Sequence, residues 1–342
     1  MSSSRLRRPP SVLALAFGVL VGAAGTVGLV TAAQQRSDEV ERIGGDPAIQ
    51  AAANDAPAEN YLVVGSDSRE NGDLENADNV GSAEEVTGSR SDTIMILRRE
   101  RNGGAYLLSI PRDLWVDIAG SGDDGKINAA FNGGPGRLAQ TITNELGIPI
   151  NHYVEVNFAG FTAMVDAIGG VEICFEYPAR DTHSGLNVDP GCPRLKGDQA
   201  LAYTRSRHYE EFRDGDWSEV GPVADLGRIA RQQAFIQAAV TQVLVEVEAN
   251  PFRLNELISA ATSAIRVDEG ANVIDSANAL RAAADAGLQT YQLPVDFIEE
   301  EGQSALELTD DAEPILDFFR GVGPPPPPTP VDTVDTVDTV ED

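Results

Sequence analysis

Residues 93–113 read TIMILRRERNGGAYLLSIPRD, in which two short apolar runs, Thr93–Leu97 and Tyr106–Ile110, are separated by charged residues and glycine. Runs like these, rich in β-branched and aromatic residues and bounded by Gly, Asn, Pro or Asp, are typical of buried strands. Two more runs of this kind occur at Tyr61–Gly65 and Tyr153–Val156.

Apolar residues also recur with the spacing of helices. The segments with this spacing are 136–146, 158–168, 228–247 and 274–286. Strands interleaved with helices predict an α/β fold, a layered α-β-α domain whose central mixed sheet is covered by helices. Functional residues of such sheets gather in the loops at the ends of the strands.

Residues 12–33 read VLALAFGVLVGAAGTVGLVTAA, 22 consecutive positions without a charge. As a helix they would span roughly 33 Å, enough to cross a bilayer. Arginines precede this segment and acidic residues follow it, so the positive-inside rule places residues 1–11 in the cytoplasm and the rest of the chain outside. We therefore expect a single-pass protein of the cell membrane. A cleaved signal peptide ending near Ala33 is the alternative, and it too places the bulk of the chain outside the cytoplasm.

The remaining chain divides into three parts. Residues 34–57 are rich in Ala, Asp, Glu and Gln and are expected to form an extracytoplasmic stalk, and residues 58–322 the globular domain. Residues 323–342 hold a proline run and an acidic VDT repeat, a composition that predicts a disordered tail because it cannot bury a core. Outside the cytoplasm a disulfide between Cys174 and Cys192 is permitted, with two buried free thiols as the alternative.

The charge of the chain limits its partners. It has 25 Lys and Arg against 54 Asp and Glu, a net charge of −29, which excludes a chain-wide basic surface for nucleic acid. Lys126 and Lys196 are the only lysines, so 23 of the 25 cationic residues are arginines. Any anion site must therefore be built mainly from arginine, whose guanidinium group binds phosphate oxygens bidentately.

Polar motifs occur where the predicted strands and helices end. They are GSDSR (65–69), RSDT (90–93), PRD (111–113), KIN (126–128), YTRSR (203–207) and GRIARQQ (227–233). In an extended segment Arg205 and Arg207 would project from one face, where two cations repel each other unless an anion joins them. Arg228 and Gln232 are four residues apart on one helix face. Surface ion pairing is the alternative role for these arginines.

Asp67 and Asp92 are candidate metal ligands. Carboxylate oxygens in loops suit Mg²⁺ or Mn²⁺, which completes its coordination with water and phosphate oxygens. Turn formation or helix capping is the alternative role. The three histidines lack a metal-site spacing, and no P-loop or dinucleotide signature is present. Trp115 and Trp217 are expected to serve packing, with stacking on a sugar as the alternative.

These motifs, in their order and spacing, resemble the LytR-CpsA-Psr family of Gram-positive envelope proteins. The segments that carry the resemblance are GSDSR (65–69), RSDTIMIL (90–97), SIPRD (109–113), KINAAF (126–131), FTAMVDAIGGVEI (161–173), LAYTRSRH (201–208) and LGRIARQQ (226–233). The cysteine pair and the segment SRHYE (206–210) are similar to the actinobacterial branch. One departure is residues 208–224, a longer connection than is usual, which contains Trp217.

The resemblance implies a phosphotransferase that moves a glycopolymer from a polyprenyl-pyrophosphate carrier to peptidoglycan, arabinogalactan being one candidate polymer. It implies that Asp67 and Asp92 hold Mg²⁺ or Mn²⁺, and Asp92 is our candidate for the base that deprotonates the acceptor hydroxyl. Arg90 and Arg112 would act with it in catalysis. The residues implied to bind the pyrophosphate are Arg90, Arg112, Arg205, Arg207, Arg228, Gln232 and Gln233. Side chains of 158–168 could line a tunnel for the prenyl chain, with an ordinary core as the alternative.

The sequence is also compatible with two other functions. The same site with water as nucleophile would be a polyprenyl-pyrophosphate hydrolase. A non-catalytic envelope regulator or lipid-carrier binding protein is the third hypothesis, and direct contact with nucleic acid is excluded by the charge and the expected topology.

Overall fold

The computed structural model describes residues 40–50, 56–66, 91–101, 104–222, 224–250, 253–271 and 288–328. The expected anchor at 12–33, the expected helix at 274–286 and the VDT repeat lie outside these residues. Among the helices in the described ranges, none is long and apolar enough to cross a membrane.

The four predicted strands lie together in one mixed sheet. Within the described residues this sheet has seven strands in the order β1-β14-β7-β2-β3-β4-β15. Their bounds are β1 (Glu41–Ile43), β14 (Ile265–Asp268), β7 (His152–Asn157), β2 (Ala58–Ser66), β3 (Ser91–Glu100), β4 (Ala105–Ile110) and β15 (Gln289–Gln292). β2 runs parallel to β7 and antiparallel to β3, and β4 runs antiparallel to β3 and parallel to β15.

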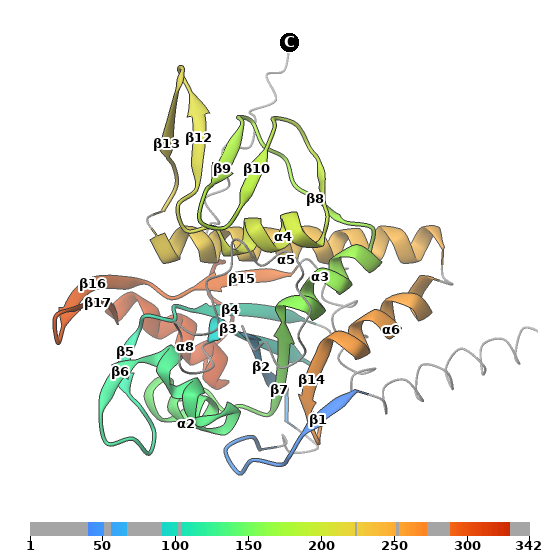
Figure 1. Ribbon diagram of the computed structural model, residues 1–342. Helices are drawn as coiled ribbons and strands as arrows, with labels where there is room; N and C mark the ends of the chain where they lie inside the picture. Colours follow the sequence, from blue (N-terminus) through green and yellow to red (C-terminus); the bar gives the residue numbers. More distant parts are fainter. Residues whose placement is uncertain are drawn as a thin grey trace, which may run out of the picture.

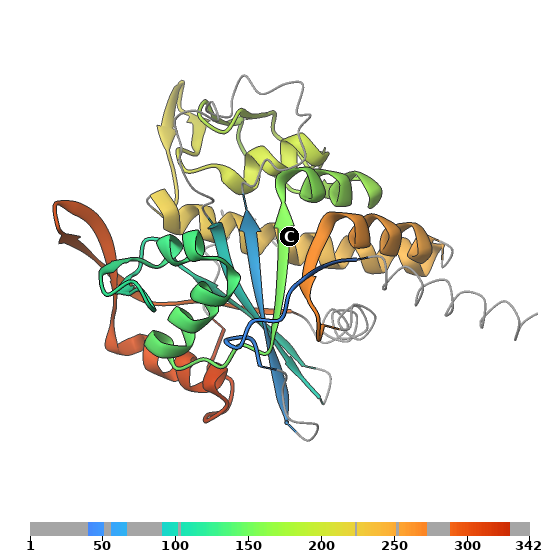
Figure 2. The same ribbon diagram turned by 60° about the horizontal axis from the view of Figure 1, so that its bottom comes forward.

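Helices lie on both faces of this sheet (Figures 1 and 2). They are α2 (Pro135–Leu146), α3 (Phe158–Ala167), α4 (Gly197–Arg205), α5 (Ala224–Ala249), α6 (Arg253–Ala264) and α8 (Glu313–Arg320), with 3-10 turns η2 (Ile127–Gly133) and η3 (Asp310–Ala312). The predicted helices at 136–146, 158–168 and 228–247 are α2, α3 and α5, with ends that shift by a few residues. The expected mixed α/β architecture with a central sheet and helices is therefore confirmed.

Alternating side chains of the strands separate the two faces of the sheet. One face carries Leu62, Ile94 and Leu108, which are buried in a single apolar cluster with side chains of α2 and α8. On the opposite face Gln233 of α5 donates to the Ser109 hydroxyl of β4 and to the Tyr291 carbonyl of β15, both at 2.9 Å. The long helix α5 is thus fixed to β4 and β15, the last two strands of the sheet, by polar contacts.

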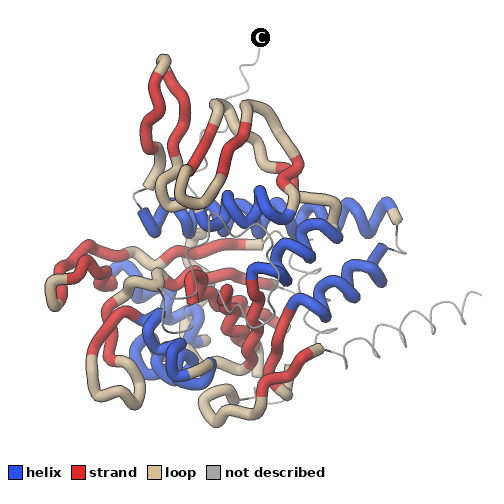
Figure 3. The backbone as a smooth tube through the Cα atoms, viewed as in Figure 1, coloured by secondary structure: helices blue, strands red, loops and turns tan. Residues whose placement is uncertain are grey.

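A smaller β-rich region lies on the far side of α4 and α5 from the main sheet (Figures 1 and 3). Its strands are β8 (Val171–Glu172), β9 (Ala179–Asp181), β10 (Leu186–Val188), β11 (Arg194–Leu195), β12 (Glu210–Arg213) and β13 (Asp216–Glu219). In the described residues β10-β9-β12-β13 form one antiparallel sheet and β11-β8 another pair. Two hairpins complete the strands, β5 (Trp115–Asp117) with β6 (Asp124–Lys126) and β16 (Val295–Glu300) with β17 (Gln303–Leu308).

A second apolar cluster joins this region to the helices. Val165 of α3, Tyr203 of α4 and Phe235 of α5 are buried in it together with side chains of β9 and β10. Phe161 and Ile168, from the segment considered for a prenyl tunnel, belong to the same cluster. These side chains therefore contribute to the packing of α3 against the small sheet.

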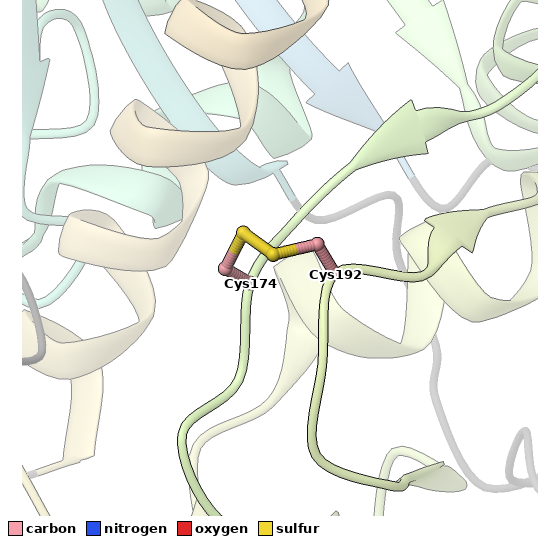
Figure 4. Close-up of a disulfide and its surroundings, with 2 residues drawn as sticks. All are labelled: Cys174 and Cys192. Carbon is pink, nitrogen blue, oxygen red and sulfur yellow. A yellow bond between two sulfur atoms is a disulfide. The ribbon is translucent and has the colours of Figure 1, made fainter.

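The disulfide permitted by the sequence is present. Cys174 and Cys192 are bonded to each other (Figure 4). The neighbouring residues Phe175 and Gly191 exchange two backbone hydrogen bonds, of 2.7 and 2.8 Å. The bond closes the segment that contains β9 and β10.

Removing this bond should destabilise the small sheet. The two cysteines are 18 residues apart, and the entropy of closing a loop of that length predicts a loss of about 3 kcal/mol in the free energy of unfolding. Urea denaturation of a Cys174→Ser/Cys192→Ser double variant and of the oxidised parent measures this loss. Equal midpoints for the two proteins would show that the bond is dispensable for stability.

Candidate anion-binding site

The ends of several strands meet at one edge of the main sheet. The carboxyl ends of β2, β4 and β7 lie there together with the first residue of β3, because β3 runs antiparallel to its neighbours. The loop Pro111–Asp113 leaves β4 at this edge. Its position is fixed by η2, since the Asn128 N–H donates to the Arg112 carbonyl at 3.2 Å.

Three arginines from different parts of the chain surround the carboxylate of Asp225 at this edge. Asp225 Oδ1 lies 2.7 Å from Arg228 Nη2, 3.4 Å from Arg112 Nε and 3.8 Å from Arg207 Nε. Asp225 and Arg228 are buried, with only 5 % and 4 % of their surface exposed. Arg112 comes from the β4 loop, Arg207 from the turn after α4, and Arg228 from the first turns of α5. The structure thus brings together three of the arginines predicted to bind an anion.

Asp225 holds its place at the start of α5 for two reasons. An acidic residue in the first turn is stabilised by the unpaired N–H groups and positive dipole end of the helix. Arg228 is three residues further on, so its guanidinium group lies next to the carboxylate on the same helix face.

The two glutamines of the same helix lie differently. The Gln232 side chain donates to the Thr93 hydroxyl at the start of β3, at 2.9 Å, and to the Thr204 carbonyl of α4, at 3.2 Å. Gln232 therefore ties α4, α5 and β3 together beside the arginines. The Gln233 amide is directed into the sheet and is 2 % exposed.

Arg205 and Arg207 do not lie in an extended segment. Arg205 is the last residue of α4, with its guanidinium carbon 4.6 Å from the ring centroid of Phe158. It forms no ion pair with a carboxylate in the described part of the chain, whereas Arg207 lies beyond the helix end and faces Asp225. The conditional expectation that both project from one strand face is wrong, because the Tyr203–Arg207 motif contains a helix terminus.

The turn that carries Arg207 is held by a buried carboxylate. Asp181 Oδ2 accepts from the Ser206 hydroxyl at 2.7 Å and from the backbone N–H groups of Arg207 and His208 at 2.9 Å. Its other oxygen accepts from the N–H of His183 at 2.8 Å. Burial opposes the charged form of Asp181, but the donated hydrogen bonds outweigh it and lower its pKa to about 2.

Arg231 holds the same turn from the opposite side. Its Nη2 donates to the Ser206 carbonyl at 2.6 Å, and its guanidinium group lies 4.9 Å from the ring centroid of Tyr209. Burial lowers the pKa of this guanidinium. Arg231 thus has a structural role, although it lies in a motif that the sequence analysis assigned to anion binding. No motif in the sequence had indicated a role for Asp181.

In the described part of the chain, cationic side chains outnumber carboxylates at this place. Among the residues that the structure describes, four cationic side chains lie here with two carboxylates: Arg112, Arg207, Arg228 and Lys126 with Asp113 and Asp225. The Arg207 Nε is buried and donates no hydrogen bond to any residue in the described ranges. Guanidinium groups this close repel each other, and an anion placed between them relieves this repulsion.

The remaining predicted residues lie outside what the structure describes. Arg90 and Asp67 are outside the described ranges, and for Asp92 only the backbone, in β3, is described. Ser66, which precedes Asp67 in the chain, pairs with Ser91, which precedes Asp92. In the described residues no group of three or more His, Cys, Asp or Glu side chains could hold a metal ion.

The sequence of the chain matches a known protein family. The model of the LytR_cpsA_psr family matches residues 26–313. The chain belongs to the LytR-CpsA-Psr family. The resemblance that the motifs carried is thereby confirmed.

Relatives and solved structures agree with this assignment. The probable cell wall biosynthesis protein LcpB of Corynebacterium glutamicum is 34 % identical over 307 residues, covering 89 % of this chain and 70 % of LcpB. The teichoic acid transferase TagU of Bacillus anthracis is 37 % identical over 153 residues, 44 % of this chain and 46 % of TagU. A LytR-Csp2A-Psr enzyme from Actinomyces oris has 25 % identity and a TM-score of 0.65 over 82 % of this chain and 96 % of its own.

An Asp181→Asn variant tests the support of the Arg207 turn. Because the pKa of Asp181 is lowered, its stabilising contribution is present above about pH 4 and is lost as the pH falls toward 2. We expect the variant to be less stable by about 2 kcal/mol at pH 7, with the difference from the parent shrinking below pH 4. Urea denaturation across this pH range measures it, with Asp189→Asn, at an exposed position of the same segment, as the control. A constant difference at every pH would contradict this role.

Proposed function

We propose that this chain is a phosphotransferase that attaches a glycopolymer from a polyprenyl-pyrophosphate carrier to peptidoglycan, arabinogalactan being one candidate polymer. The observation that carries the proposal is the convergence of Arg112, Arg207 and Arg228 on one buried carboxylate. A diphosphate group carries the negative charge that offsets repulsion between neighbouring guanidinium groups, and arginine matches its oxygens in pairs.

The names of the relatives support the same reaction class. TagU of Bacillus anthracis is described as a polyisoprenyl-teichoic acid–peptidoglycan teichoic acid transferase, and LcpB as a cell wall biosynthesis protein. This chain covers under half of TagU's length, so the polymer it transfers is not carried over from that relative.

The proposed transfer forms one bond to phosphorus and breaks another. The oxygen of an acceptor hydroxyl on peptidoglycan attacks the phosphorus nearer the sugar, a new P–O bond forms, and the bond to the bridging oxygen breaks. Polyprenyl phosphate leaves with the bonding electron pair, and the hydroxyl proton passes to a base, for which Asp92 is our candidate. Negative charge grows on the bridging oxygen, where fixed guanidinium groups such as Arg112 stabilise it without reorganisation.

Asp67 and Asp92 are proposed to hold Mg²⁺ or Mn²⁺, and Arg90 and Arg205 to complete the pyrophosphate site. The pairing of Ser66 with Ser91 supports this, because it brings the two motifs to one edge of the sheet. Carboxylates are hard oxygen donors that suit either ion. When bound, the ion would neutralise phosphate charge.

The expected membrane anchor at 12–33 fits the proposed lipid substrate. A polyprenyl carrier remains in the bilayer, so an enzyme acting on its headgroup gains from being held at the same surface. We propose a single-pass membrane protein with its catalytic domain outside the cytoplasm.

Arginine variants test the proposal. The full chain is given a polyprenyl-pyrophosphate oligosaccharide with and without peptidoglycan, and polymer attached to peptidoglycan is measured. Loss of transition-state charge stabilisation predicts that Arg112→Ala and Arg207→Ala each lower kcat/KM for transfer by about 100-fold. Arg194→Ala, which removes a surface arginine paired with Glu246, should leave transfer unchanged.

Two outcomes would contradict the proposal. Release of free phosphate as the sole product, in the presence of a competent acceptor, identifies a hydrolase. Transfer that persists in both arginine variants identifies a binding or regulatory role for the arginine site.

A further inference from the structure

The small sheet presents one face to solvent. Along β12 and β13, Phe212 is paired with Trp217 and Glu210 with Glu219, so these four side chains project from one face. Across β9, Arg180 is paired with Glu210 and, on its other side, with Asn187 of β10. The opposite face of the same strands is buried against the helices through residues such as Ala179, Asp181 and Glu211.

Two aromatic rings form the centre of this exposed face. The ring centroids of Phe212 and Trp217 lie 5.4 Å apart, and the Arg180 guanidinium carbon lies 4.1 Å from the Trp217 centroid. Arg180 is held there by Glu210, at 2.7 Å. Phe212 is 39 % exposed, which makes it one of four large apolar side chains exposed among the described residues.

Aromatic rings beside fixed polar groups are suited to sugars. The C–H face of a sugar ring packs on an aromatic ring, and its hydroxyl groups hydrogen-bond to carboxylate, amide and guanidinium groups. Here Glu210 and Glu219 supply acceptors, Arg180 supplies donors and Asn187 supplies both.

The hairpin is connected directly to the anion-binding site. β12 begins three residues after Arg207, and β13 ends six residues before Asp225. His208 Nδ1 lies 3.1 Å from Glu219 Oε1, so the base of the hairpin contacts the turn that carries Arg207. Figure 1 shows the hairpin rising from the amino-terminal end of α5. A polymer held by a diphosphate at the arginines would have its sugars beside this hairpin.

The charge of the hairpin selects among sugars. Residues 208–219 contain five acidic residues and one arginine, a net charge of −4. This charge repels polymers that carry phosphate groups and peptidoglycan strands that carry peptide carboxylates. An uncharged sugar chain has no such penalty.

We propose that the exposed face of β12 and β13, centred on Phe212 and Trp217, binds uncharged sugars of the donor glycopolymer next to its diphosphate. This inference rests on the proposed function and adds to it the class of polymer that is transferred. The surface lies on the connection 208–224, the segment in which this sequence departs from the family pattern.

Binding of uncharged oligosaccharides tests this inference without any transfer reaction. Arabino-, galacto- and gluco-oligosaccharides of about five sugars are titrated into the full chain by calorimetry. Trp217→Ala and Phe212→Ala should each weaken binding by about tenfold, because each removes a stacking ring. Both variants should keep the parental affinity for inorganic pyrophosphate.

A spectroscopic measurement and a matched control accompany this experiment. The chain has two tryptophans, so in a Trp115→Phe variant the fluorescence reports on Trp217 alone and should change when an oligosaccharide binds. Phe297→Ala removes another exposed phenylalanine of a hairpin and should have no effect.

Three results would overturn the inference: no uncharged oligosaccharide binds, both ring variants bind as the parent does, or a glycerol-phosphate oligomer binds as tightly as the uncharged sugars. A failure of the transfer assay alone would refute the proposed function and leave the sugar-binding result standing.

Discussion

The candidate site depends on the ion pairing of the Asp225 carboxylate with three arginines. This carboxylate is a single negative charge, buried at the start of α5. It attracts Arg112 of the β4 loop and Arg207 of the turn after α4, and both thus lie close to Arg228 of α5. Without it, three cations from separate elements would repel each other at the edge of the sheet. Among the described residues the cations here outnumber the carboxylates. One buried acid thus brings together arginines that suit a larger anion.

This local excess explains how an acidic protein can bind an anionic group. The net charge of −29 repels anions in general, and part of this charge lies in the terminal repeat, far from the arginines in sequence. At the candidate site the positive charge belongs to a few side chains, and Asp181 holds the turn that carries one of them, Arg207. Recognition is therefore local, and the remaining surface has no indiscriminate attraction to anionic wall polymers.

Much of the fold could be read from the sequence, because its central elements are governed by local patterns. The apolar runs at Tyr61–Gly65 and Thr93–Leu97 are strands of the main sheet, and the spacing in 136–146 and 228–247 gave helices close to their true ends. The small sheet was missed because its strands are only two to four residues long and carry no periodic pattern.

The candidate site could be predicted only in part from the sequence. Arginines in recognisable motifs pointed to Arg112, Arg207 and Arg228, but their common partner Asp225 and the support from Asp181 depend on contacts between distant segments. Asp225 had one usable signal, its position three residues before Arg228, where the predicted helix 228–247 begins. Gln233, in contrast, was assigned to the pyrophosphate site from its motif, yet its amide is used to fix α5 on the sheet.

A crystal structure of the full chain with a bound short-chain polyprenyl-pyrophosphate sugar tests the central claim most directly. The account predicts that diphosphate oxygens lie within hydrogen-bond distance of Arg112, Arg207 and Arg228, with Asp225 still at the centre of the three guanidinium groups. A diphosphate bound elsewhere, with these arginines paired only to protein carboxylates, would contradict it.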